Sequence, residues 1–164
     1  MLGKALELFP ALGRKLRTAA GLPIATVGLT GAVWVLLWPA RLAVAIFPLR
    51  RLVRFYGRDH GARVVIPEAS SRELDLARQI GEAIAIAVRY SPASANCYPQ
   101  ALVARALLRW RRVPHGLFFG LRRGSDDKEM EAHAWVMVGD CAVSGGNSFD
   151  QYTVVRCFSS PGVR

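Results

Sequence analysis

The stretch 96–121, NCYPQALVARALLRWRRVPHGLFFGL, decides the fold class of this chain. Asn96 and Pro99 are typical of a helix start, and apolar residues then recur at helical spacing. Val113-Pro114 predicts a turn, and the largely apolar residues 115–123 predict a strand. The stretch is therefore expected to be a helix followed by a strand, with Cys97 where the helix begins.

A second stretch, residues 131–146 with the sequence EAHAWVMVGDCAVSGG, predicts a β-hairpin. Residues 132–138 would form its first strand, Gly139-Asp140 its tight turn, and residues 141–144 the returning strand. After a loop, residues 151–158 predict a last strand.

Another helix is predicted upstream. Ser70 and Glu73 have the spacing of a capping box, and apolar residues at 3.6-residue spacing continue to Tyr90. Residues 57–67 are expected to form a linker, or a short strand around residues 64–66. Helices thus precede a small antiparallel sheet, which predicts an α+β domain.

Composition limits the function classes. The 164 residues are 52% hydrophobic, which is enough for one compact domain with a real core. Cys97, Cys141 and Cys157 show neither paired nor zinc-ligand spacing, so we expect no disulfide framework, no metal and no cofactor. This cysteine usage fits a reducing, cytoplasmic compartment. The net charge of +10 favours acidic partners, but no DNA- or RNA-binding motif is present, so we expect no nucleic acid partner.

The first third of the chain is apolar and basic. Residues 18–40 carry no charge and are long enough to cross a bilayer, although glycine, proline and threonine dilute the apolar signal. Residues 41–56 place apolar residues at helical spacing between arginines, and Pro48 should divide that helix. We expect residues 1–60 to be a helical extension that packs on the following domain or on a partner protein, or that contacts a membrane.

Cys97 and His133 are the candidate reactive residues. Unpaired N–H groups at the start of a helix stabilise a thiolate, and a histidine on a neighbouring strand can act as its base. Each residue also has an ordinary structural interpretation, as a small buried cysteine and as a satisfied core histidine.

The two stretches together resemble the transglutaminase-like leader peptidases of bacterial lasso-peptide biosynthesis. That family shows a cysteine opening a helix, a basic tail ending near a proline, an apolar strand ending in a glycine, and a His-Ala-Trp-Val strand. The resemblance covers roughly residues 68–158, and it is carried by Cys97, Ala101, Leu102, Pro114, Gly120, His133, Ala134, Trp135 and Val136.

The resemblance implies a papain/transglutaminase-like peptidase domain over residues 61–164, with Cys97 as nucleophile and His133 as base. It also implies that the substrate is a ribosomally made lasso-peptide precursor. The partners would then be a separate leader-recognition protein and the lasso cyclase. Transglutaminase-type transfer to an amine and a non-catalytic membrane or scaffold module are the alternatives.

The sequence allows two candidates for the third catalytic residue. Members of the family generally carry an aspartate on the strand after the histidine, but Asp140 lies about 23 Å from His133 along an extended strand. A hairpin about Gly139-Asp140 instead places Asn147 opposite His133, so an amide oxygen would accept the imidazole N–H. Asp150 is the alternative third member.

One backbone group and three further residues have expected roles or positions. The Cys97 backbone N–H is expected to contribute to an oxyanion hole. Gln100 would cap the helix or contact substrate, His115 would lie on the surface, and Arg105 would point outward or lie near the C-terminal end of the helix.

Overall fold

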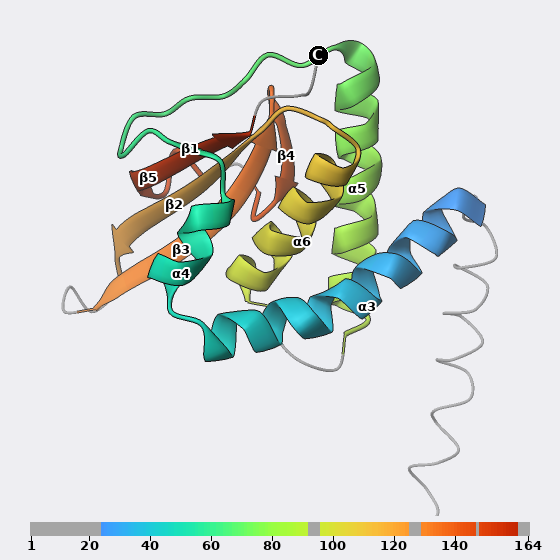
Figure 1. Cartoon of the computed structure of the whole chain (residues 1–164), viewed down its shortest axis with the longest axis horizontal. Coiled ribbons are helices and arrows are strands. Elements are labelled where there is room, and N and C mark those ends of the chain that lie inside the picture. The colour runs from blue at the N-terminus through green and yellow to red at the C-terminus, as the bar shows by residue number, and fades with distance from the viewer. Residues whose placement is uncertain (1–23, 92–95, 125–128, 147, 161–164) are drawn as a thin grey trace, which may run out of the picture.

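The computed structural model describes residues 24–91, 96–124, 129–146 and 148–160 (Figure 1). The helical elements are α3 (Ile24–Ile46), α4 (Leu49–Leu52), η1 (Val53–Phe55), α5 (Ser71–Arg89) and α6 (Cys97–Trp110). The strands are β1 (Arg58–Asp59), β2 (His115–Arg123), β3 (Met130–Val138), β4 (Cys141–Ser144) and β5 (Thr153–Ser160). The predicted α+β class is confirmed.

The strands form one antiparallel sheet in the order β1-β5-β2-β3-β4. Helices α5 and α6 pack together against one face of it (Figure 1). Strand β3 lies between β2 and β4, and its register pairs Ala134 with Phe119 and His133 with Gly120. The hairpin turns at Gly139, whose φ of +53° suits glycine, so the predicted turn is confirmed.

The capping box predicted at Ser70 is present. The Ser70 side chain accepts a hydrogen bond from the Glu73 N–H, and the Glu73 carboxylate accepts one from the Ser70 N–H. Along α5, the buried residues recur every three or four positions and face the sheet and α6. Gly81 brings this helix close to β4, because a Cβ there would lie 3.3 Å from the Val143 carbonyl oxygen.

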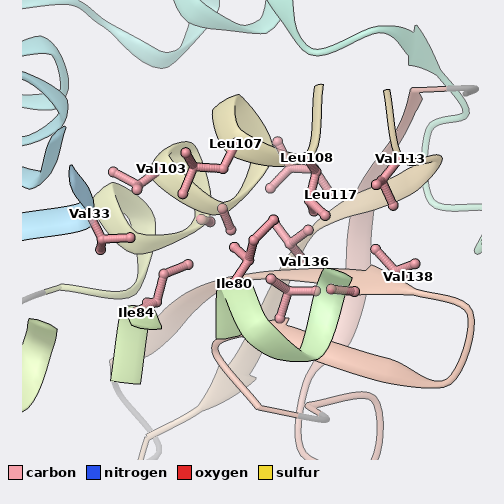
Figure 2. Packing of buried hydrophobic residues seen from close by; sticks show 14 of the residues in the cluster. Val33, Ile80, Ile84, Val103, Leu107, Leu108, Val113, Leu117, Val136 and Val138 are labelled. Carbon is pink, nitrogen blue, oxygen red and sulfur yellow. The ribbon is translucent and has the colours of Figure 1, made fainter. Parts of the chain in front are cut away.

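Two apolar clusters occupy the two faces of the sheet. The larger one lies between the helices and the sheet and includes Ile80, Leu108 and Val136 (Figure 2). The smaller one contains Phe118, Trp135, Met137 and Cys157 on the other face. Successive residues of β3 therefore alternate between the clusters, with Ala134, Val136 and Val138 toward the helices.

Helix α3 packs against α5 and α6 through one side only. Val33 and Leu37 are buried in the larger cluster, and Figure 1 shows the helix running beside that helix pair. Within the described residues, one helical segment, Thr26–Ile46, is long enough and apolar enough to cross a membrane. Pro48 ends this helical run and forms the N-cap of α4, as the sequence predicts.

Of the two expectations for residues 57–67, the linker is present, because residues 60–67 form no helix or strand. The alternative of a strand around residues 64–66 is wrong: the short strand falls at Arg58–Asp59, where β1 pairs with the outer edge of β5. In α6, Arg105 does not point outward: it is 7% exposed, and its guanidinium donates a hydrogen bond to the Phe55 carbonyl oxygen. The boundary at residue 60 stays a prediction.

Candidate active site

Cys97 is the first residue of α6 and is half-buried against the larger apolar cluster. Asn96 is the N-cap, but its side chain makes no capping hydrogen bond. The N–H groups of the first turn of an α-helix have no intrahelical partner. The Asn96 side chain does not occupy them, and Pro99 has no N–H, so the N–H groups of Cys97 and Tyr98 point out of this end of α6.

His133 lies near the start of β3, with its imidazole half-buried. The ring stacks on Tyr152 at 4.8 Å and on Trp135 at 5.8 Å between centroids. Nε2 lies 2.9 Å from the carbonyl oxygen of Gly145. Because a carbonyl oxygen only accepts, Nε2 carries the proton, and Nδ1 is the nitrogen without a proton in the neutral ring.

Gly145 is placed against His133 by its own backbone. Its φ is +74°, and a Cβ there would lie 2.7 Å from the Ala134 oxygen and 3.0 Å from His133 Nε2. The Ser148 hydroxyl also donates to the Gly145 carbonyl oxygen, at 2.8 Å. Gly145 was not among the residues predicted from the sequence, although the Gly145-Gly146 pair is a signal for positive φ.

The predicted third catalytic residue does not follow from these contacts. Asn147 lies outside the described residues. Asp150 is exposed, and within the described part of the chain it makes no hydrogen bond to His133. The hydrogen-bond partner that the structure gives the imidazole is the Gly145 carbonyl oxygen, at Nε2, and the third catalytic residue stays a prediction.

Cys97 and His133 are linked through their neighbours. The ring of Tyr98 contacts Phe119 at 5.4 Å, and Phe119 is the β2 partner of Ala134. The Cys97 side chain packs with the cluster on the helical face, whereas the imidazole lies with Trp135 on the other face. No hydrogen bond joins the two side chains among the contacts of the described residues, so their catalytic pairing stays a prediction.

A buried polar network lies beside the first turn of α6. The Tyr98 and Tyr56 hydroxyls are 2.5 Å apart, and the Arg105 guanidinium lies over the Tyr56 ring at 5.3 Å. Burial raises the pKa values of both tyrosines and lowers the pKa of Arg105 to about 10. This network attaches Phe55 and Tyr56 to α6.

His115 is buried, which corrects the expectation of a surface histidine. Its side chain is 1% exposed, and Nδ1 lies 2.8 Å from the Val113 carbonyl oxygen. Burial lowers the pKa of His115 to about 4, with smaller contributions from Arg105 and Arg109. The ring is therefore neutral and belongs to the core at the start of β2.

The other two cysteines lie in strands. Cys157 is buried and Cys141 is half-buried, and burial raises the pKa of each thiol. The part of the chain that the structure describes contains no group of three or more His, Cys, Asp or Glu side chains suited to a metal ion.

The comparison with known families agrees with this architecture. A family model described as the transglutaminase-like superfamily matches residues 34–157. The chain therefore belongs to the transglutaminase-like superfamily. Such domains are typically cysteine peptidases or acyltransferases, and the fold of this chain is compatible with either activity. Searches of curated proteins and of solved structures gave no significant match.

The matched range begins inside α3, because residue 34 lies in that helix. The buried side chains of Val33 and Leu37 belong to the same cluster as those of α5 and α6. Helix α3 thus shares one apolar core with α5 and α6.

Proposed function

We propose that this chain is a cysteine peptidase that removes the leader from a ribosomally made lasso-peptide precursor. Membership of the superfamily and the position of Cys97 as the first residue of α6 carry the proposal. The sequence resemblance supports the substrate class. On this proposal, a separate leader-recognition protein presents the precursor, and the lasso cyclase uses the product in the cytoplasm.

The proposed reaction is acyl transfer to water. The Cys97 thiol gives its proton to His133, and the thiolate attacks the carbonyl carbon at the leader–core junction. N–H groups at the start of α6 stabilise the oxyanion. The imidazolium then protonates the leaving amine of the core peptide, and water hydrolyses the thioester to release the leader carboxylate and restore the thiol.

The hydrogen bond to Gly145 supports Nδ1 as the base. With the proton on Nε2 directed at the Gly145 oxygen, Nδ1 of the neutral ring carries no proton and can accept the one from the thiol. Accepting it makes the ring positively charged, and the carbonyl dipole at Nε2 stabilises that charge. The proposal requires the thiol and the imidazole to approach each other around the start of β3, where Met130 and Ala132 are exposed.

Product analysis tests the proposal directly. A candidate precursor is incubated with the full chain and its leader-recognition protein, and the products are identified by mass spectrometry. We expect free leader and free core peptide with the wild type and none with Cys97→Ala or His133→Ala. Attachment of the leader to an added amine would instead indicate transglutaminase activity.

Thiol alkylation tests the pairing without any substrate. Cys141 is an internal control, because it is half-buried and burial raises the pKa of its thiol. We expect iodoacetamide to label Cys97 at least tenfold faster than Cys141 at neutral pH, and His133→Gln to remove most of this difference. Equal labelling rates, unchanged by His133→Gln, would indicate a non-catalytic Cys97.

A further inference from the structure

Helix α3 is apolar on the side that faces away from the domain. Its buried side is formed by Val33 and Leu37, which pack against α5 and α6. Large apolar side chains also recur at helical spacing on the other side, and they are 40–60% exposed: Val27, Trp34, Val35, Trp38, Leu42 and Ile46. A helix that is apolar all round is normally buried on all sides.

Exposed apolar side chains also follow along the chain beyond the end of α3. Phe47, Leu49 and Phe55 are between 43% and 69% exposed. We call these three residues and the six of α3 the apolar face. Monomeric soluble proteins rarely expose so many large apolar side chains in one continuous segment.

Charge along this segment has one sign. From Ile24 to Arg58 the chain contains no aspartate or glutamate. Arginines interrupt its second half, at Arg41, Arg50, Arg51, Arg54 and Arg58. The Arg41 guanidinium lies over the Trp38 ring, at 5.9 Å from its centroid. Exposed tryptophans beside arginines are typical of segments that lie at the boundary between lipid headgroups and acyl chains.

We propose that the apolar face of α3, α4 and η1 binds the surface of an anionic lipid membrane, with α3 lying in the plane of the interface. A protein–protein interface usually has a polar rim with hydrogen bonds across it. The exposed side of α3 has almost no polar side chains before Arg41 that could make such bonds with a protein partner. The arginines match anionic headgroups, and the apolar side chains match the acyl region. This proposal does not depend on the peptidase activity.

The packing of α3 distinguishes lying in the interface from crossing the bilayer. The length of Thr26–Ile46 would allow a span. A spanning helix, however, would have to leave the domain, which would expose the surfaces that Val33 and Leu37 now bury at 0% and 2% exposure. In the interfacial arrangement, one side of α3 stays packed against the domain while the other side contacts the acyl chains.

Vesicle flotation of the full chain tests the proposal. The probes are phosphatidylcholine vesicles and phosphatidylcholine vesicles that contain phosphatidylglycerol. We expect the chain to float with the anionic vesicles, to shift its tryptophan emission to shorter wavelength, and to dissociate as salt is raised. Release by alkaline carbonate is expected for an interfacial helix.

Matched variants identify the binding surface. Val35→Glu and Leu42→Glu change two residues that are 60% exposed, and each should weaken vesicle binding about tenfold. Val155→Glu is the control, because Val155 is 43% exposed on β5, outside the apolar face, and it should leave binding unchanged. Replacing Arg50, Arg51 and Arg54 by glutamine should reduce binding to the anionic vesicles at least tenfold.

Four outcomes would overturn the proposal. In the first, the wild type does not float with either kind of vesicle. In the second, Val35→Glu floats as well as the wild type, and in the third, the bound chain resists extraction by carbonate. In the fourth, the wild type forms a dimer, Val35→Glu dissociates that dimer, and neither protein binds vesicles. The second outcome would assign binding to another part of the chain, and the last would assign the apolar face to a second copy. Circular dichroism of each variant establishes that it is folded.

Discussion

The imidazole Nε2 of His133 donates a hydrogen bond to the carbonyl oxygen of Gly145, at 2.9 Å. A backbone oxygen thus orients the ring through Nε2, and the side-chain amide or carboxylate expected from the sequence stays a prediction. The stacked rings of Tyr152 and Trp135 fix the plane of the imidazole.

The Gly145-Gly146 pair offers a matched comparison of two alanine substitutions. Both residues have positive φ, +74° and +69°. A Cβ at Gly145 would meet the Ala134 oxygen and the Trp135 Cβ at 2.7 Å, whereas a Cβ at Gly146 has nothing within 4 Å. We expect Gly145→Ala to lower the free energy of unfolding by roughly 3 kcal/mol or more, and Gly146→Ala by about 1 kcal/mol. Urea denaturation measures both, and equal losses would contradict the contact geometry.

The tautomer of His133 can be observed directly. Nitrogen-15 chemical shifts of the imidazole should show the neutral ring protonated at Nε2, because that nitrogen donates to Gly145. Ser148→Ala removes the second donor to the same carbonyl oxygen and should cost about 1 kcal/mol of stability while leaving the Nε2 proton in place. A ring protonated at Nδ1 in the wild type would refute the orientation, and with it Nδ1 as the base.

Lysine substitutions at Arg105 and Arg109 measure how much a buried guanidinium contributes to the free energy of unfolding, because they leave the net charge unchanged. Arg105 donates to the Phe55 carbonyl oxygen and stacks over Tyr56, whereas Arg109 is exposed. Lysine has a compact, strongly hydrated ammonium that cannot make both contacts. We expect Arg105→Lys to lower the free energy of unfolding by about 2 kcal/mol and Arg109→Lys to change it by less than about 0.5 kcal/mol. Similar values for the two variants would contradict the structural role of Arg105.

His115 should make the protein acid-sensitive. Its pKa falls from an ordinary value of 6.5 to about 4 in the folded chain because it is buried. Between these values the unfolded chain binds the extra proton, so stability is complete above pH 6.5 and is lost as the pH falls toward 4. The loss amounts to about 3 kcal/mol. In His115→Leu this part of the pH dependence should disappear, whatever the stability of the variant at neutral pH. An unchanged slope of unfolding free energy against pH would show that other groups cause the acid sensitivity.

Local sequence signals determined most of the architecture. The Ser70–Glu73 capping box, the helix that begins at Cys97, the strand His115–Arg123 and the turn at Gly139 all lie where their sequences predict. Each depends on residues close together in the chain, namely cap residues, apolar periodicity and turn glycines. These signals were sufficient for the α+β class.

The tertiary structure decided what depends on distant parts of the chain. His115 and Arg105 are polar residues whose sequence neighbours suggest exposure, and both are buried only because β2, α6 and η1 pack together. The Gly145 oxygen faces His133 because of a positive φ and a register shift in the β3–β4 pairing. The sequence by itself determined which residues could react and which helix is apolar. Only the packing of the layers decided which carbonyl oxygen holds the imidazole and which side of α3 is left uncovered, because both are set by contacts between elements far apart in the chain.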